Sequence, residues 1–139
     1  MRAVLPDTSA WIVFLRRCCP DRLKESMQSA LIDGRVHTCW VVRAELLIGA
    51  RDEAARQELD RLLAALPHVE LGEEVWAEAS RTGLGLRLEG QSVPLTDLVI
   101  AQAAASAGLE LWHLDAHYEL IAGRAGVTQV AFERSPPDT

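Results

Sequence analysis

The sequence predicts an α/β fold, a three-layer sandwich in which helices cover both faces of a mostly parallel central sheet. Short apolar runs alternate along the chain with longer segments of helical periodicity. Strands that are separated by helices pair in parallel through right-handed crossovers, which place the helices over the sheet. The 139 residues, of which 49% are hydrophobic, suffice for one domain with a sizeable core. We expect that domain to span residues 1–134 and residues 135–139 to form a flexible tail.

The elements of the first half follow from apolar runs and from helix start and stop signals. Ala3-Val4-Leu5 is a short apolar run typical of a buried strand, and Asp7 after it is a good helix N-cap. Pro20 begins the next helix, and Gly34 ends it. A later helix is apolar on nearly every side, and the amphipathic helix after it stops before Pro67. The expected strands are residues 2–6, 36–39 and 68–71, and the expected helices are residues 7–17, 20–33, 41–50 and 52–66.

The second half continues the alternation of helices and strands. Helical periodicity resumes at Glu73, although Gly83 and Gly85 disfavour a helix in the second part of that segment. Pro94 begins the following helix, and Gly108 ends it. The expected helices are residues 73–88, 94–107 and 116–122, and the expected strands are residues 110–114 and 127–132.

Composition excludes several classes of protein. The net charge of −6 argues against a nonspecific nucleic-acid binder, which carries a basic surface. Three cysteines without a CxxC pair argue against a disulfide scaffold or a zinc site. No apolar run reaches the ~20 residues that span a bilayer, and the N-terminus lacks the features of a signal peptide. We therefore expect a cytoplasmic protein with no membrane contact.

Four acidic residues are candidates for a functional site. Asp7 and Asp115 each follow a predicted strand directly, so both are expected at the carboxyl edge of the sheet, where such folds bind ligands. Asp97 lies in the first turn of a predicted helix, and Glu45 lies inside the apolar helix. From position alone, helix capping is the simpler explanation for the three aspartates.

Glu45 favours a site over capping. Its neighbours on the helix are mostly Val, Leu and Ile, and a buried carboxylate without a partner costs several kcal/mol. Arg43, two positions away, points elsewhere on a helix and is a poor partner. If the four acids converge, their mutual repulsion requires a divalent cation, and sites made of oxygen ligands favour Mg²⁺ or Mn²⁺. Such a site orients phosphates and activates water, which favours phosphodiester hydrolysis.

Four segments resemble the motifs of the PIN-domain ribonucleases, one for each acid. In order of the acids, these segments are residues 4–12, 44–51, 95–101 and 114–122. Their order and spacing follow the family from residue 2 to about residue 132. The chain length and the segment AELLIGAR at residues 44–51 are most similar to VapC-type toxins of toxin–antitoxin pairs.

This resemblance implies an endoribonuclease toxin that a cognate antitoxin wraps and blocks. It implies a homodimer, an RNA substrate, and a Mg²⁺ or Mn²⁺ ion. The residues implied to be both catalytic and metal-binding are Asp7, Glu45, Asp97 and Asp115. Ser9 matches a hydroxyl that helps to order the metal or its water, and Thr8 beside it is a second supporting residue.

The chain departs from the family pattern at two histidines. His113 stands where the family often has threonine, and His117 stands where it often has a further acid. The second departure predicts one firm metal position and a weaker second one. His117, Arg43 and Arg87 are candidate contacts to the substrate or the antitoxin.

Two other functions stay open at this point. One is a non-catalytic PIN-like module that binds its partner and regulates transcription through the complex, which the presence of all four acids disfavours. The other is a different Mg²⁺-dependent phosphohydrolase or phosphotransfer domain. Ser9 stands where a haloacid-dehalogenase-like site has a second aspartate, and Lys24 is the only lysine, far from the position that a receiver domain needs.

Overall fold

A parallel three-stranded sheet lies at the centre of the computed structural model, which describes residues 1–134. The predicted tail, residues 135–139, lies outside the described residues. The strand order is β1 (Val4–Pro6), β2 (Glu110–His113) and β3 (Gln129–Ala131). Both strand pairs are parallel, with Leu5 opposite Leu111 and Leu111 opposite Gln129.

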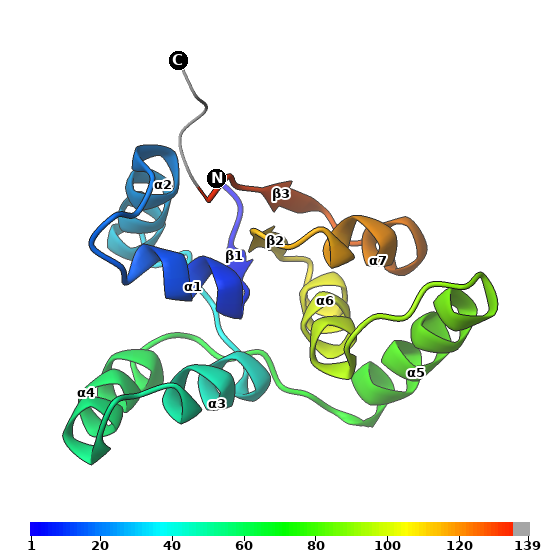
Figure 1. Ribbon diagram of the computed structural model, residues 1–139, viewed down its shortest axis with the longest axis horizontal. Coiled ribbons are helices and arrows are strands. Elements are labelled where there is room, and N and C mark those ends of the chain that lie inside the picture. Colours follow the sequence, from blue (N-terminus) through cyan, green and yellow to red (C-terminus); the bar gives the residue numbers. More distant parts are fainter. Residues whose placement is uncertain (135–139) are drawn as a thin grey trace.

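Helices cover the sheet on both sides, as the sequence predicts. In Figure 1 the strands lie between one pair of helices, α1 (Thr8–Phe14) and α2 (Asp21–Ile32), and another, α6 (Leu95–Ala107) and α7 (His117–Ala125). The helix α3 (Trp40–Ile48) packs beside α1, α4 (Glu53–Ala64) packs against α3, and α5 (Glu73–Leu88) packs along α6 and α7. The three-layer α/β prediction is therefore confirmed. Within residues 1–134, the structure contains no helix long and apolar enough to cross a membrane.

The strands predicted at residues 36–39 and 68–71 are wrong as full strands. Each forms only an isolated parallel bridge, Val36 to Val4 and Thr38 to His68. The hydrogen bonds that extend the sheet this way are few, such as His37 N–H to the Val4 carbonyl at 2.8 Å. A longer ladder cannot form because the chain turns into α3 at Trp40, directly after these bridges.

Helix α5 runs without interruption through the two glycines that disfavoured it. A Cβ atom at Gly83 would lie 2.8 Å from Leu98 Cδ1 on α6, and one at Gly85 would overlap the Arg124 guanidinium on α7. Gly83 therefore allows α5 to pack closely against the buried Leu98 on α6, whereas the flexible Arg124 side chain beside Gly85 can shift. The packing at Gly83 offsets the helix propensity of about 1 kcal/mol that this glycine gives up relative to alanine.

The core forms between the two helical layers and the sheet. Val4, Leu5 and Leu111 on the strands are fully buried, as are Trp11 on α1 and Ile100 on α6. The first helix ends at Phe14 rather than at residue 17, so α1 is short. This short helix begins at the carboxyl end of β1, and it therefore fixes the position of the residues around Asp7.

Candidate metal centre

Asp7 lies where β1 meets α1. Its backbone N–H donates to the Trp112 carbonyl at 2.9 Å, which ties it to β2. Its carboxylate caps α1 by accepting the Ala10 N–H at 2.9 Å, and it accepts the Ser9 hydroxyl at 2.7 and 2.9 Å. The side chain is buried, and this burial raises the pKa of Asp7 while the bonds from Ser9 and Ala10 oppose the rise. The prediction that Asp7 caps α1 is confirmed. Its side chain is also buried more deeply than a helix cap requires.

Ser9 joins the ends of the two central strands. Besides donating to Asp7, its Oγ accepts the Leu114 N–H at 3.0 Å. Leu114 precedes Asp115, so this bond holds Asp7 and Asp115 at the same edge of the sheet. Ser9 therefore joins two parts of the chain that lie 105 positions apart in the sequence.

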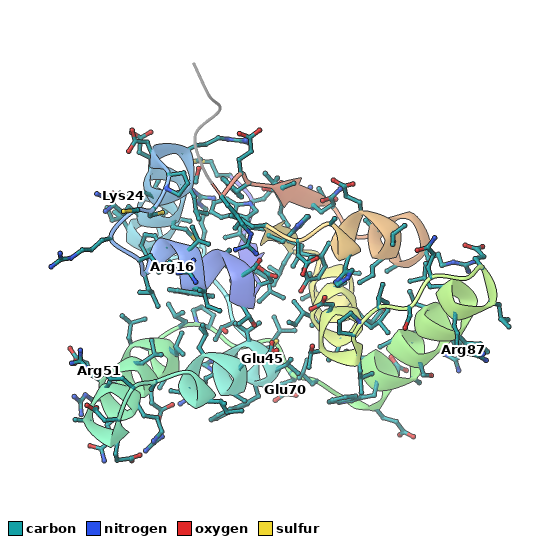
Figure 2. All side chains as sticks on the ribbon, in the orientation of Figure 1. Arg16, Lys24, Glu45, Arg51, Glu70 and Arg87 are labelled. Atoms are coloured by element: carbon teal, nitrogen blue, oxygen red, sulfur yellow. The ribbon has the colours of Figure 1, made fainter. Side chains whose placement is uncertain are left out.

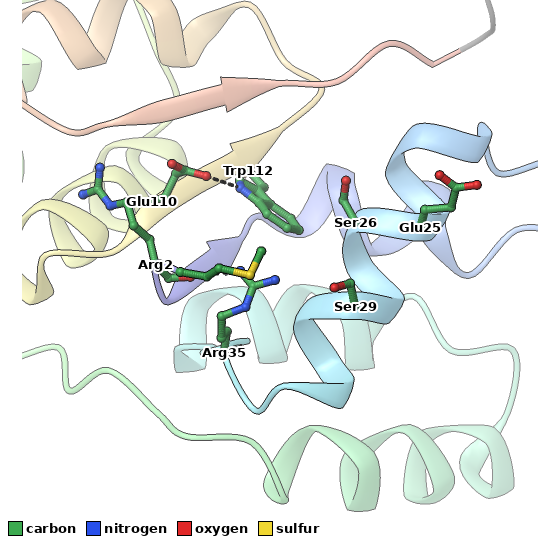
Figure 3. Close-up of a pocket in the computed structure, with 8 residues that line it drawn as sticks. Arg2, Glu25, Ser26, Ser29, Arg35, Glu110 and Trp112 are labelled. Atoms are coloured by element: carbon green, nitrogen blue, oxygen red, sulfur yellow. Dashed lines mark hydrogen bonds between the residues drawn. The ribbon is translucent and has the colours of Figure 1, made fainter.

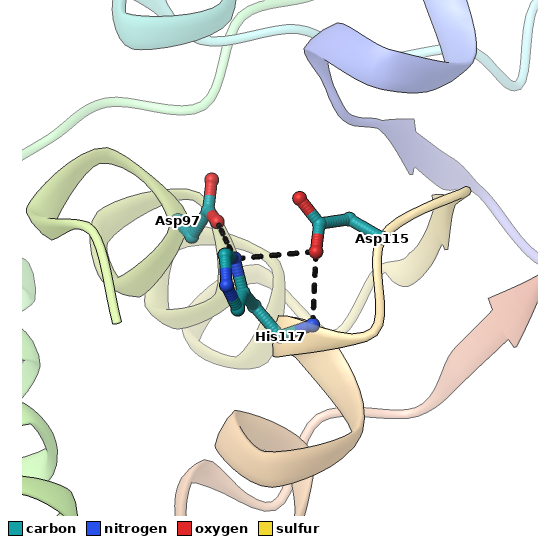
Figure 4. Close-up of side chains that lie close together, drawn as sticks. All are labelled: Asp97, Asp115 and His117. Atoms are coloured by element: carbon teal, nitrogen blue, oxygen red, sulfur yellow. Dashed lines mark hydrogen bonds and ion pairs between the residues drawn. The ribbon is translucent and has the colours of Figure 1, made fainter. Parts of the chain in front are cut away.

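Asp97, Asp115 and His117 form the tightest group of possible metal ligands among residues 1–134 (Figure 4). One ligand atom from each lies within 4.8 Å of the others. His117 Nδ1 lies 3.1 Å from Asp97 Oδ2 and 3.2 Å from Asp115 Oδ1. Burial raises the pKa of Asp97; the hydrogen bond from His117 opposes this rise and the charge of Asp115 adds to it.

Tyr118 links Asp7 to this cluster, a role that the sequence analysis did not assign. Its hydroxyl donates to Asp97 Oδ1 at 3.3 Å, and the side chain is fully buried. Burial, followed by the charges of Asp7 and Asp97, raises the pKa of Tyr118. The hydroxyl therefore stays protonated beside both carboxylates. The sequence did contain a signal for Tyr118, because a residue three positions after Asp115 lies in the first turn of the following helix, close to that carboxylate.

Glu45 reaches the same edge from α3. Its Oε1 accepts the Thr8 hydroxyl at 2.6 Å, and Thr8 is adjacent to Asp7 in the chain. The side chain is half-buried, as its apolar neighbours predicted, and Figure 2 shows Glu45 on the inner side of α3. Glu45 is not part of the three-residue cluster, and its link to this edge is the hydrogen bond from Thr8.

His113 positions the loop that carries Asp115. Its Nδ1 accepts the Asp115 N–H at 3.2 Å, so the ring proton is assigned to Nε2, which donates to Gln129 Oε1. The imidazole is buried and packs against Tyr118, with ring centroids 4.8 Å apart. His113 thus supplies hydrogen bonds at a position where the family often has threonine.

The two candidate arginines lie away from the acids. Arg43 is buried, donates twice to Asp60 Oδ1 at 2.9 and 2.6 Å, and donates to His68 Nε2 at 3.1 Å. Its guanidinium also lies 3.9 Å from the centre of the Trp40 ring. Arg43 therefore bonds to groups within the fold, and its contact to substrate or antitoxin stays a prediction. Arg87 is exposed on α5, distant from Glu45 in Figure 2.

A separate hollow of about 450 Å³ opens beside the amino ends of β1 and β2 (Figure 3). The Trp112 Nε1–H donates there to Glu110 Oε1 at 2.7 Å, and Arg35 Nη1 donates to the Arg2 carbonyl at 3.0 Å. These polar groups already bond to one another. The four predicted acids gather instead at the carboxyl ends of the strands, where parallel folds bind ligands.

The donor set at the carboxyl edge suits a divalent cation. Asp97 and Asp115 offer carboxylate oxygens, His117 offers a nitrogen, and Asp7 approaches from β1 through Tyr118. Burial raises the pKa of Asp97, and the like charge of Asp115 opposes its ionisation further. A bound cation would remove that penalty and provide positive charge in an acidic protein.

Comparisons with known proteins identify the family that has this fold. The PIN domain model matches residues 4–124. Ribonuclease VapC18 of Mycobacterium tuberculosis is 30% identical over 124 residues, covering 86% of this chain and 88% of that protein. The structure of VapBC-5 from Mycobacterium tuberculosis, of the VapBC family of toxin–antitoxin systems, matches with a TM-score of 0.69 and 27% identity, covering 95% of this chain and 100% of that chain. VapBC2 from Rickettsia felis, solved with a promoter DNA fragment, shares the fold with a TM-score of 0.76 at 16% identity, covering 94% of this chain and 98% of that one. The chain therefore belongs to the PIN domain family and, within it, to the VapC proteins.

Proposed function

We propose that this protein is a metal-dependent endoribonuclease toxin, which hydrolyses RNA phosphodiester bonds and is neutralised by a cognate antitoxin. The observation that carries the proposal is the cluster of Asp97, Asp115 and His117 at the carboxyl edge, with the buried Asp7 beside it. Kinship with VapC18 and with the VapBC-5 complex supports the same activity and the same kind of partner. We assign Mg²⁺ or Mn²⁺ as the cofactor.

Each acid has a distinct part in this mechanism. A bound divalent cation would orient the phosphate and lower the pKa of a water molecule. Asp97 and Asp115 would hold that ion with anionic oxygens, and Asp7 would add a carboxylate whose orientation Ser9 and Ala10 fix. Glu45, fixed by Thr8 and half-exposed, is placed to accept a proton from the attacking water. Without a cation, this edge would repel a polyanionic substrate, so the activity requires metal.

We propose that the antitoxin binds in the groove between α1, α3 and α4. This hollow has a volume of about 340 Å³ and is lined mostly by apolar side chains, among them Ile12, Leu15, Leu46 and Leu59. Glu45 lines its end, so an apolar helix bound here would cover the approach to the acids. The homodimer and the cytoplasmic location are further proposals, which rest on the family resemblance and on the composition.

The test is cleavage of a mixed RNA pool by the purified protein with Mg²⁺, with Mn²⁺ and with EDTA. The decisive variant is Asp97→Asn, and the matched control is Asp33→Asn, an exposed aspartate between α2 and the sheet. We expect metal-dependent cleavage that Asp97→Asn abolishes and Asp33→Asn retains. Cleavage that persists in EDTA or in Asp97→Asn would contradict the assigned site. No cleavage by folded, antitoxin-free protein, together with binding of a partner, would favour a regulatory module.

A further inference from the structure

We propose that His117 is a nitrogen ligand of the metal, and that this makes the centre bind Mn²⁺ in preference to Mg²⁺. The inference rests on the proposed metal site and extends it to the identity of the ion. The sequence analysis treated His117 as the loss of an acidic ligand and as a contact to substrate. The position of the His117 ring indicates instead that a nitrogen ligand has replaced an oxygen ligand.

The spacing of the three donor atoms supports this role. His117 Nδ1 is 3.1 Å from Asp97 Oδ2 and 3.2 Å from Asp115 Oδ1. Neighbouring ligands at right angles, each about 2.1 Å from a six-coordinate ion, are separated by about 3.0 Å. Nδ1 therefore lies at a ligand's distance from both carboxylates, and Figure 4 shows it directed between them.

The backbone holds His117 in this position. Its N–H donates to Asp115 Oδ1 at 2.9 Å, at the start of α7. The next residue, Tyr118, is buried and donates to Asp97, so the first turn of α7 is held against the cluster at two points. The His117 side chain is 41% exposed, which leaves the cluster open to an ion from solution. A ring placed for substrate alone would have no need to face both carboxylates.

A nitrogen donor changes which ion the site prefers. Mg²⁺ binds oxygen ligands and gives up its water reluctantly, whereas imidazole suits first-row transition metals better. In family members that have an acid at the position of His117, all of these ligands are oxygens, which suits Mg²⁺. With His117 in that place, we expect the affinity for Mn²⁺ to exceed that for Mg²⁺ by a wider margin.

The test compares the wild type, His117→Asp and His37→Asn. His117→Asp restores a carboxylate, and His37 is a control histidine whose Nδ1 contacts the Arg35 carbonyl, outside the cluster. Calorimetric titration with Mn²⁺ and with Mg²⁺ gives the ratio of the two affinities. Pulsed electron paramagnetic resonance of bound Mn²⁺ detects directly whether a nitrogen is coordinated, with no need for RNA cleavage.

We expect nitrogen coupling in the wild type and in His37→Asn, and none in His117→Asp. We also expect His117→Asp to lower the ratio of Mn²⁺ to Mg²⁺ affinity by about tenfold, chiefly through weaker Mn²⁺ binding, since the loss of even a hydrogen-bond partner of a ligand weakens metal binding by about 10–100-fold. If His117→Asp does not fold by circular dichroism, His117→Ala replaces it, and the wild-type spectrum alone still shows whether nitrogen is bound.

Mn²⁺ binding without nitrogen coupling would overturn this inference and leave the metal site standing. Coupling that survives the loss of His117 would also overturn it. If the wild type binds neither ion, the inference and the proposed metal site both fail. RNA cleavage, measured separately in Mn²⁺ and in EDTA, tells that failure apart from a wrong ligand assignment.

Discussion

Replacing Ser9 by alanine tests how the buried Asp7 is held at the edge of the sheet. Ser9 Oγ donates to both oxygens of Asp7 and accepts the Leu114 N–H, so the variant removes three contacts at once. Asp7 keeps its backbone partners, among them the Ala10 N–H, but loses its hydroxyl donor from Ser9. We expect Ser9→Ala to fold, to lose stability and to lose most of its RNA cleavage, because Asp7 and the Asp115 loop are no longer tied together.

The magnitude follows from the burial of these groups. A hydrogen bond to a charged group contributes about 1.5–3 kcal/mol, and a buried N–H left without a partner costs about 1 kcal/mol more. Asp7 is only 3% exposed, so water cannot replace the lost donor fully. We therefore expect a loss of about 3 kcal/mol at neutral pH. For a domain of this size, that lowers the melting temperature by roughly 10 °C.

The loss should depend on pH, with a defined sign. Because burial holds the folded pKa of Asp7 above its unfolded value, the folded protein loses stability as the pH rises through that folded pKa. The Ser9 bond favours the ionised carboxylate, so its removal raises the pKa of Asp7 further and enlarges this loss. The difference in stability between Ser9→Ala and the wild type should therefore grow from about pH 4 to about pH 7.

The assay is urea unfolding at both pH values in EDTA, which keeps metal out of the comparison. The matched control is Ser80→Ala, since Ser80 is an exposed serine that donates to the Ala77 carbonyl on α5. We expect the control to change stability by less than about 0.5 kcal/mol. If Ser9→Ala unfolds like the control at both pH values, the reasoning about Asp7 is refuted.

Three further variants test other contacts. Thr8→Val removes the hydroxyl that donates to Glu45, so it should lower the rate of RNA cleavage more than it lowers stability. Thr8→Ser keeps the hydroxyl and should retain activity. Equal cleavage rates in the two variants would contradict the role of Thr8 in positioning Glu45. Arg43→Ala should cost about 2 kcal/mol in urea unfolding, because it breaks a partly buried ion pair, while cleavage by the folded variant should persist. Gly83→Ala should be less stable in thermal unfolding than Gly123→Ala by about 1–3 kcal/mol, since only Gly83 faces a close side chain; equal stability would refute that packing argument.

Much of the site could be predicted from local patterns. Asp7 and Asp115 were expected at the carboxyl edge because each follows an apolar strand, and the parallel pairing of β1 and β2 brings both strands' ends to that edge. Glu45 was expected to be partly buried from its neighbours alone, and its half-buried position confirms this. The metal and catalytic roles of these residues stay predictions that the experiments above test.

Other features could not be predicted, because they depend on which distant groups meet. Arg43 was a candidate contact to partners, but its bonds to Asp60 and His68 form only once α3 packs against α4 and the segment that follows it. Gly83 and Gly85 argued against a helix until the neighbouring side chains were visible. Residues 36–39 and 68–71 had the pattern of strands, and the early start of α3 reduced them to single bridges.

By itself, the sequence determined the order of the helices and of the three strands that form the sheet, and the edge where Asp7 and Asp115 lie, because periodicity and caps are local properties. Only the tertiary structure decided how that edge is held. Ser9 meets Leu114 across 105 positions, Thr8 meets Glu45 across 37, and His117 turns its ring toward Asp97 across 20. A hydrogen bond forms only where packing brings a donor within about 3 Å of an acceptor. No local pattern contains that distance, so the contacts that Ser9, Tyr118 and His117 make became visible only in the folded chain.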